Sequence, residues 1–598
     1  MNTSISSASE AFLSVFRSLQ SDGFHAAQQL AMAFDRAGQS VLLEADLIAG
    51  VGMNITPEQT AQETPSVPSP GIRLLRWALF AGVSGRKSIS LEFLTISAQT
   101  LDPDETLKWV TWIEEKTGSR AMALQLMAAL ATVYANDARR QWLIACALSG
   151  HADEASLKLR QATLLRAWQV NPMVDPALPL QLALERRFAG DWQAVEHICR
   201  AQLARSPGDL EMSWQLACAQ WHRHDPAAAE ATMRAANAFH PGNSDLIAAV
   251  AQFVAEQARY GEARQLYERA LELQPNMPTP SVDLAELELR NDDWPRGWAR
   301  YEARLTRTDR GANSVVSIMG RLAPHWTGQS LEGRTLMVYS EQGSGDDIQM
   351  VRLVPALAAH VQAQGGRLVL ACKRILRSLF SRYYAPCIEI EARNYTEHGT
   401  PDYCLPMMSV PFALRLKPEQ VHGAPYLMPD PARAAQWRSR VREATPLPDA
   451  LQIGLVWRGN PSHRRDAQRS MALETLAPLF ALENRVFHPL TPGHTNLPAN
   501  VPHCDLTPWY RDGFEDVAAH VCALDAVVTI DSAPLHLGGA LGVPVLAMLD
   551  CVSQWAWGTQ ETQRWYDSVT LFRQPRPGDW QPVVARVAER LAAFNASS

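Results

Sequence analysis

VVTIDSAPLHLGGALGVPVLAML, residues 527–549, predicts a strand, a short helix and a second strand. Its first four residues form an apolar, β-branched run, as expected for a parallel strand buried on both faces. Ser532 can cap the helix that follows, and Pro534 suits the first turn of a helix. Residues 545–549 form a second apolar run. Parallel strands that are joined by a helix predict an open α/β sheet.

Polar residues follow the first of these strands, at the edge where open α/β sheets bind ligands. Asp531 and Ser532 come directly after the strand, and His536 lies in the first helical turn. A helix N-terminus presents backbone N–H groups and a positive dipole to an anion. We therefore expect Asp531, Ser532, Ala533, Pro534 and His536 to form the phosphate end of a nucleotide-sugar site. The alternative is an ordinary helix cap beside a buried, hydrogen-bonded histidine.

Length and composition set limits on the function. The 598 residues are too many for one hydrophobic core, and the net charge of −7 argues against general nucleic-acid binding. Nine cysteines occur without a CxxC pair or a Cys/His cluster, which is typical of a reducing compartment without structural zinc. The N-terminus lacks the basic region of a signal peptide, and no apolar run approaches the roughly 20 residues of a membrane span. We expect a cytoplasmic protein with no membrane span.

A repeat with a period close to 34 occupies residues 171–310. Small residues keep this register, as at Ala183, Ala217 and Ala251. A 34-residue period indicates tetratricopeptide repeats, whose paired helices need small residues where they touch. The concave face of such a solenoid is expected to bind a protein. The period is marked by one ladder at Pro172, Pro207, Pro241 and Pro275 and a second at Asp191, Asp225, Arg259 and Asp293.

The remaining chain is expected to divide into three parts. Residues 1–170 have irregular helical patterning, which allows degenerate repeats. A polar linker at 306–317 separates the repeats from alternating strands and helices, which imply an α/β domain. This domain is expected to have two Rossmann-like halves, at 325–445 and 446–598, with a closing helix at the C-terminal end.

A glycine-rich loop with two carboxylates follows the first predicted strand of the α/β domain. Gly343, Ser344 and Gly345 allow the loop to approach a ligand closely, and the adjacent Asp346 could act as general base toward an acceptor hydroxyl. The alternative is that Asp346 caps a helix that is predicted to run to about Gln364. Pro355 is expected to kink this helix or to mark its first turn.

An arginine-rich loop at residues 457–470 follows the strand predicted at 452–457. Four arginines and one histidine lie within twelve residues of this loop, and they could hold a diphosphate, or a phosphate together with a carboxylate. The alternative is a solvated surface loop. The candidate ligands of the phosphate are Asn460, Arg464 and Arg469.

The α/β part resembles bacterial glycosyltransferases that follow tetratricopeptide repeats, and its last half resembles heptosyltransferase-type GT-B enzymes. The resemblance begins near Trp294 and runs to the C-terminus. It rests on Glu341-Gln342-Gly343, Gly345-Asp346, Ile348-Gln349, Gly454-Leu455-Val456-Trp457, Gly459-Asn460-Pro461, His463, Arg469-Ser470, Asp531-Ser532, His536-Leu537, Trp555-Ala556-Trp557, Trp565-Tyr566 and Leu571-Phe572-Arg573-Gln574.

The whole arrangement resembles the flagellin glycosyltransferases of stalked alphaproteobacteria. The resemblance implies a metal-independent enzyme without a cofactor, whose second half binds a CMP-linked nonulosonic acid of the pseudaminic type. It also implies that the repeats dock flagellin and that Asp346 takes the proton of a Ser or Thr hydroxyl. Asn460, Arg464, Arg469, the N–H groups of residues 532–535 and His536 would then stabilise the leaving phosphate.

Three departures from the family pattern leave alternatives open. Asp346 is followed by Asp347 where the family has Thr, so either carboxylate could be the base. Ser344 replaces a more usual Leu, and His488-Pro489 replaces Ser-Leu-Gln at a strand end, so recognition of the nucleotide base could differ. Two other functions remain possible: a transferase for a lipid or polysaccharide acceptor, and an inactive repeat adaptor.

Overall fold

The computed structural model describes residues 120–307, 311, 313–390, 399–447, 449–561 and 563–594. The first 119 residues of the predicted 1–170 region therefore lie outside the described residues. The chain divides into two compact units, residues 1–205 and 206–598. The four-part division predicted from the sequence is finer than this and stays a prediction. Among the described residues, no helix combines the length and apolar character that crossing a membrane demands.

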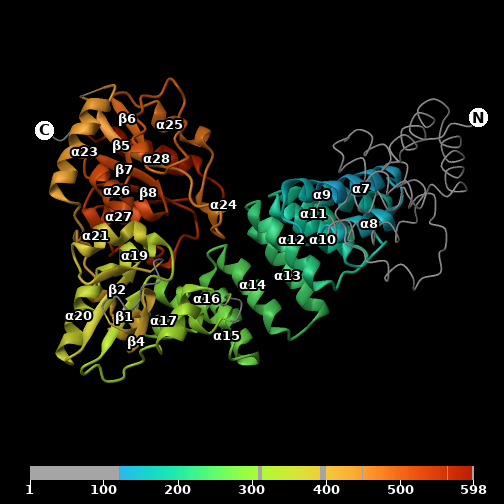
Figure 1. Ribbon diagram of the computed structural model, residues 1–598, viewed down its shortest axis with the longest axis horizontal. Helices are drawn as coiled ribbons and strands as arrows, with labels where there is room; N and C mark the ends of the chain where they lie inside the picture. The colour runs from blue at the N-terminus through green and yellow to red at the C-terminus, as the bar shows by residue number, and fades with distance from the viewer. Residues whose placement is uncertain are drawn as a thin grey trace, which may run out of the picture. The chain divides into compact units, whose positions relative to one another are not determined.

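Successive helix pairs make up most of the described part before the sheets (Figure 1). In the first unit these helices are α7 (Arg120–Val133), α8 (Ala138–Ala147), α9 (Glu154–Val170), α10 (Leu178–Phe188) and α11 (Trp192–Leu203). In the second unit they are α12 (Leu210–His222), α13 (Pro226–Phe239), α14 (Ser244–Ala255), α15 (Tyr260–Leu273), α16 (Pro278–Arg290) and α17 (Trp294–Tyr301).

The ladder at Asp191, Asp225, Arg259 and Asp293 marks the residue that precedes the second helix of each pair. The Asp191 and Asp225 side chains accept hydrogen bonds from the backbone N–H three residues on, which satisfies a helix end. The alanines of the predicted register are fully buried, because a larger side chain would separate the helices of a pair. They are Ala183, Ala217, Ala251, Ala229 and Ala263.

The first sheet has four parallel strands in the order β3-β2-β1-β4. Alternate residues of β1 face opposite layers: Leu336 and Val338 pack with α20, whereas Met337 and Tyr339 pack with α18. The elements are α18 (Val315–Leu322), β1 (Thr335–Tyr339), α19 (Ser344–Val351), α20 (Val354–Ala363), β2 (Arg367–Cys372), α21 (Arg374–Ser381), β3 (Cys387–Glu389), β4 (Tyr403–Pro406) and α22 (Val410–Ala413).

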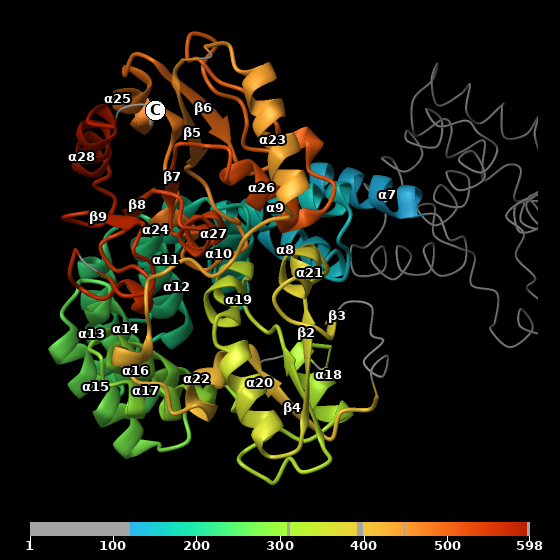
Figure 2. The ribbon, with the colours of Figure 1, turned by 90° about the vertical axis from the view of Figure 1, so that its left-hand side faces the viewer.

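The second sheet has five parallel strands in the order β6-β5-β7-β8-β9, and the opening stretch supplies β7, α27 and β8 as predicted. Its elements are α23 (Pro431–Ala444), β5 (Leu451–Val456), α24 (Asp466–Arg469), α25 (Ala477–Phe480), β6 (Arg485–Pro489), α26 (Gly513–Val521), β7 (Ala526–Ile530), α27 (Ala533–Leu541), β8 (Val545–Leu549), β9 (Val569–Arg573) and α28 (Gln581–Ala592). Figures 1 and 2 both show α19 and α27 between the two sheets.

The segment predicted as one helix from Asp346 to about Gln364, with Pro355 as a kink or as its first turn, forms two helices in the structure, α19 and α20. Pro355 lies in the first turn of α20. It has no N–H to donate to the Val351 carbonyl, so a continuous helix would lose a hydrogen bond there.

The last repeat is built into the core of both sheets. Trp294 stacks on Trp565 with ring centroids 5.5 Å apart, and Trp298 meets Trp555 edge-on at 5.1 Å. Trp294 and Trp298 are each 1% exposed, so they belong to the same core as the strands. The fold class predicted from the sequence is confirmed in its layers: helical tetratricopeptide-type repeats are followed by an α/β domain with two parallel-sheet, Rossmann-like halves.

Candidate active site

A pocket of about 920 Å³ lies where the carboxyl ends of both sheets face the last repeats. The loop after β1 forms one wall, and the loops after β5, β7 and β8 form the second. Helices α14, α15, α16 and α17 supply a third wall, which includes Tyr260, Tyr267, Asp283 and Glu286. Sequence reasoning missed the residues of this third wall, because no motif marks them.

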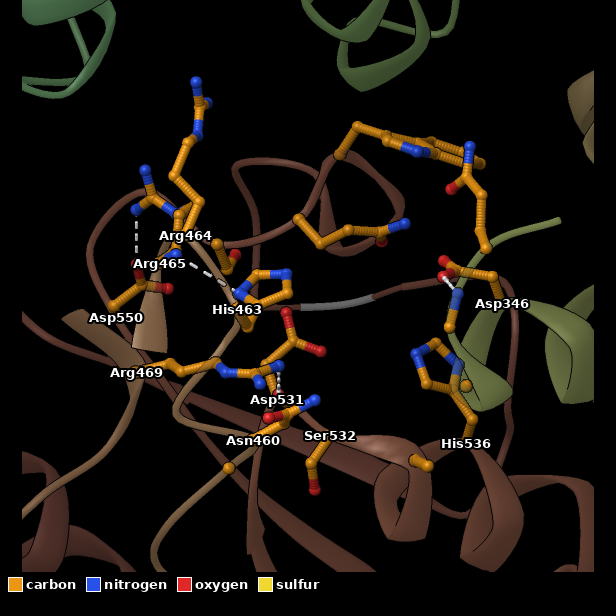
Figure 3. A pocket seen from close by; sticks show the side chains of 18 of the residues that line it. Asp346, Asn460, His463, Arg464, Arg465, Arg469, Asp531, Ser532, His536 and Asp550 are labelled. Carbon is orange, nitrogen blue, oxygen red and sulfur yellow. Dashed lines mark hydrogen bonds and ion pairs between the residues drawn. The ribbon is translucent and has the colours of Figure 1, made fainter. Parts of the chain in front are cut away.

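Every predicted site residue lines this one pocket. They are Gly343, Ser344, Gly345 and Asp346 from the first half, and Asn460, Arg464, Arg469, Asp531, Ser532, Ala533, Pro534 and His536 from the second. Figure 3 shows Asp346 and His536 on one side of the pocket, Arg464 and Arg465 on the other, and Asp531 between them. The structure thus brings these side chains together; the roles assigned to them stay predictions.

The two halves meet most closely where α19 and α27 begin. A Cβ atom added to Gly345 would lie 2.8 Å from Cδ2 of His536 and 3.4 Å from Cα of Ala533. A real Cβ does not fit at the first distance, so glycine is required for this approach. Two helix N-termini therefore face one pocket, and each presents partial positive charge.

Asp346 is half-buried, and its Oδ2 accepts a hydrogen bond of 2.9 Å from the Gly343 N–H. The carboxylate therefore caps α19, which was the structural alternative for this residue. Burial, with the adjacent negative charge of Asp347, raises the pKa of Asp346 to about 7. A carboxylate with this pKa can take up a proton near neutral pH.

The Asp347 side chain pairs with Lys373 and does not line the pocket. Its side chain is 1% exposed, and Oδ2 lies 2.5 Å from Nζ of Lys373. Burial raises the pKa of Asp347 to about 6, although Lys373 opposes the shift. Lys373 also donates to the Gln342 carbonyl oxygen, so it holds the loop on both sides of Gly343. Of the two carboxylates, only Asp346 lines the pocket.

The arginines of the 457–470 loop differ in their contacts. Arg469 donates to the Asp531 carbonyl oxygen at 3.0 Å and pairs with Asp466 at 3.3 Å, which joins the loops after β5 and β7. Arg464 is exposed and extends away from Asp531 (Figure 3).

Arg464 acts electrostatically on the repeat wall. Burial, with the charge of Asp283 added, raises the pKa of Glu286 to about 7, and the positive charge of Arg464 opposes this shift. The same arginine opposes the raised pKa of Asp283, whose main cause is burial. The charge of Arg464 thus acts on two carboxyl groups of α16 that line the same pocket.

Arg465 corrects the expectation that all four arginines of the loop could hold phosphate. Its guanidinium bonds Glu256 of the repeats, Asp550 at 2.6 Å and the Val552 carbonyl oxygen at 2.7 Å. These three acceptors use both terminal nitrogens of the side chain. Arg465 is therefore a structural link in this loop.

The N-terminus of α27 offers fewer donors than the sequence predicted. Ser532 precedes the helix but makes no capping bond, and its Oγ lies 3.1 Å from Thr529 Oγ1. Pro534 has no N–H, and the Leu535 N–H already donates to the Ser532 carbonyl oxygen. Ser532 and Ala533 carry the amides that this turn can present to an anion.

His536 is 5% exposed, and its Nδ1 lies 3.0 Å from the Tyr566 hydroxyl oxygen. Burial, with the positive charge of Arg352 added, lowers the pKa of His536 to about 3, so the ring is neutral near pH 7. The ring satisfies both expectations at once: it is a buried, hydrogen-bonded histidine and it lines the pocket.

His488, which departs from the family pattern, is fully buried within the second half. Its Nε2 lies 2.9 Å from Gln452 Oε1, and its Nδ1 lies 3.3 Å from Nε2 of His520. It is absent from the residues that line the pocket. Over the part of the chain that the structure describes, no three His, Cys, Asp or Glu side chains gather as ligands for a metal ion.

No family model matches this chain. A curated relative, Protein FlbA of Caulobacter vibrioides, is 30% identical over 337 residues, which cover 50% of this chain and 53% of the relative. The chain therefore spans about half the length of that relative.

Similar solved structures include both repeat proteins and glycosyltransferases. A thermophilic TPR protein from Thermus thermophilus is 18% identical, covering 29% of this chain and 94% of that one, with a TM-score of 0.24. A family 9 glycosyl transferase from Veillonella parvula is 12% identical, covering 41% and 87%, with a TM-score of 0.30. A mutant O-GlcNAc transferase from Thermobaculum terrenum is 15% identical, covering 73% and 91%, with a TM-score of 0.25.

Proposed function

We propose that this protein is an O-glycosyltransferase that moves a sugar from a nucleotide donor to a Ser or Thr hydroxyl of a protein. The donor is a CMP-linked nonulosonic acid such as pseudaminic acid, and the acceptor is flagellin, docked by the repeats in the cytoplasm. One observation carries the proposal: the pocket places the Asp346 carboxylate opposite the arginine loop and the N-terminus of α27.

Asp346 acts as the general base in this proposal. The hydroxyl oxygen of the acceptor forms a bond to the anomeric carbon while the bond from that carbon to the phosphate oxygen breaks. Asp346 receives the hydroxyl proton, for which a pKa of about 7 is suitable. Asp347 is a poor alternative, because it is buried against Lys373.

The second half stabilises the negative charge that develops on the departing nucleotide. Asn460, Arg464 and Arg469 line this side of the pocket, and the amides of Ser532 and Ala533 add the positive end of α27. In this proposal the two arginines and the end of the helix provide the positive charge, and Asn460 provides a hydrogen-bond donor.

His536 adds a neutral hydrogen-bond donor. Burial keeps the pKa of Tyr566 raised, so its hydroxyl holds its proton and can donate to Nδ1 of His536. That arrangement leaves the proton of the imidazole on Nε2.

A catalytically inactive adaptor is the second candidate, because Asp346 already serves α19 as a cap. Co-expression of the full chain with flagellin and a donor-synthesising pathway, followed by intact-mass analysis of flagellin, separates the two. We expect the wild type to add the mass of one or more sugars, and Asp346→Asn to abolish the addition. Full transfer by Asp346→Asn removes the base assignment. Flagellin that binds the chain but gains no mass supports the adaptor.

A further inference from the structure

The arginine-rich loop of the donor half rests directly on the repeats. Arg465 Nη1 bonds Glu256, the residue that follows α14, while Nη2 bonds Asp550 and the Val552 carbonyl oxygen after β8. These contacts join positions 209 and 85 residues away from Arg465 in the chain. One side chain thus ties together a repeat helix and two loops of the pocket.

The contact is buried and continues into the next turn of the loop. The side chains of Glu256 and Asp550 are 9% and 5% exposed, and that of Arg465 is 20% exposed. Gln468 donates to the Trp221 carbonyl oxygen of α12 at 3.3 Å, and the Arg465 guanidinium lies 5.8 Å from the Trp221 ring. Two repeat helices therefore hold residues 465–468.

The residues on either side of this anchor are those proposed to meet the phosphate. Asn460 and Arg464 lie just before Arg465, and Arg469 ends the short helix α24 that begins after it. The Arg469 N–H donates to the Arg465 carbonyl oxygen at 3.2 Å. This hydrogen bond couples the backbone position of Arg469 to that of Arg465.

We propose that Arg465 is a positioning residue through which the repeats order the phosphate-binding loop. The repeats then have two functions: they dock the acceptor and they complete the donor site. This inference deepens the proposed function and rests on it for the identity of the donor. Arg465 itself does not touch the nucleotide in this account, because both terminal nitrogens of its guanidinium already bond two carboxylates and a carbonyl.

Hydrogen–deuterium exchange tests the anchor without any ligand. In the full chain, Glu256→Gln and Arg465→Gln should speed exchange of the amides at residues 463–470 by about tenfold or more, because local opening becomes easier. Exchange in β5 should not change. Arg259→Gln and Glu262→Gln are matched controls, because Arg259 also bridges two carboxylates, Glu230 and Glu262, but none of these three residues lines the pocket. Unchanged exchange in both test variants overturns the proposal.

Nucleotide binding and transfer kinetics test the functional consequence, with CMP as the probe. Glu256→Gln should weaken CMP binding and raise the KM of the donor about 10- to 100-fold, since small displacements at a site have effects of this size. The KM of the acceptor should not change. Arg465→Lys should bind CMP more tightly than Arg465→Gln, because Lys keeps one ion pair.

The outcomes distinguish this inference from the proposed function. If Arg465→Gln weakens CMP binding while Glu256→Gln does not, Arg465 contacts the donor directly and the positioning role is overturned. If the wild type does not bind CMP at all, the proposed donor fails, whereas the exchange experiment still decides whether the repeats hold the loop. If Arg465→Gln does not fold, the milder Glu256→Gln carries the test.

Discussion

At the scale of single residues, Asp346 combines a capping bond with a proposed catalytic role. Its pKa of about 7 results from burial and from the neighbouring Asp347. A base works only when ionised, so we expect the transfer rate to rise with pH through about 7 and to level off above it. Initial rates between about pH 5 and pH 9 check this expectation. A rate that is already maximal at pH 5 contradicts it.

Asp346→Asn separates chemistry from stability. Asn can still accept the hydrogen bond from Gly343, but it cannot take a proton, so transfer should fall about 10²- to 10⁴-fold. Folding raises the pKa of Asp346, so the protonated carboxyl stabilises the folded state. This stabilisation is fully present at pH values below the ordinary pKa of 3.8, and it is lost as pH rises through about 7. The Tm of Asp346→Asn at pH 8 should therefore equal or exceed that of the wild type.

Asp347→Asn is the control for this pair of measurements. It breaks a buried ion pair with Lys373, so its Tm should fall at the same pH. A lower Tm for Asp346→Asn than for Asp347→Asn would contradict the assigned roles.

At the scale of elements, the sequence predicted strands well and the ends of helices less well. Strands β1, β5, β7 and β8 lie within a residue or two of their expected positions, because short buried apolar runs are distinctive. The break between α19 and α20 was missed, because apolar residues keep helical spacing across it, from Val351 to Val354 and Leu357. Pro355 was expected to kink the helix or to mark its first turn, and the structure shows it in the first turn of the second helix.

Contact between α19 and α27 depends on Gly345. In Gly345→Ala the new Cβ would lie 2.8 Å from the buried His536 ring, so we expect a loss of about 1–3 kcal/mol in the free energy of unfolding. Gly320→Ala in α18 is the matched control, since a Cβ there meets nothing within 4 Å. Urea unfolding of both variants gives the comparison, and equal stability would show that the two helices do not need this close approach.

At the scale of the whole molecule, the last repeat shares one hydrophobic core with the two sheets of the second unit. Trp294 and Trp298 of α17 fill the same core as Trp555 and Trp565 of the second half. Sequence periodicity predicted the repeats themselves. Periodicity could not predict the third wall of the pocket. Residues such as Glu286 reach the pocket because distant segments of the chain pack together, and no local sequence pattern marks them.

Trp294→Ala tests this integration. Removal of a fully buried Trp should lower the free energy of unfolding by about 3–5 kcal/mol, and the loss should extend to the sheets because they share its core. Trp509, which is 53% exposed, is the control, and Trp509→Ala should change stability by about 0.5 kcal/mol or less. Unfolding followed in urea measures both. Sheets that keep wild-type stability in Trp294→Ala would show that the repeats are separable.

The central claim is that one pocket holds a nucleotide phosphate on the second half while Asp346 faces it from the first. A crystal structure of the full chain with CMP bound tests this claim most directly. We predict that the phosphate lies within hydrogen-bonding distance of Arg469 or of the Ala533 N–H, with Asp346 across the pocket from it. A nucleotide bound outside this pocket, or a phosphate that has no contact with the arginine loop or α27, would contradict the account.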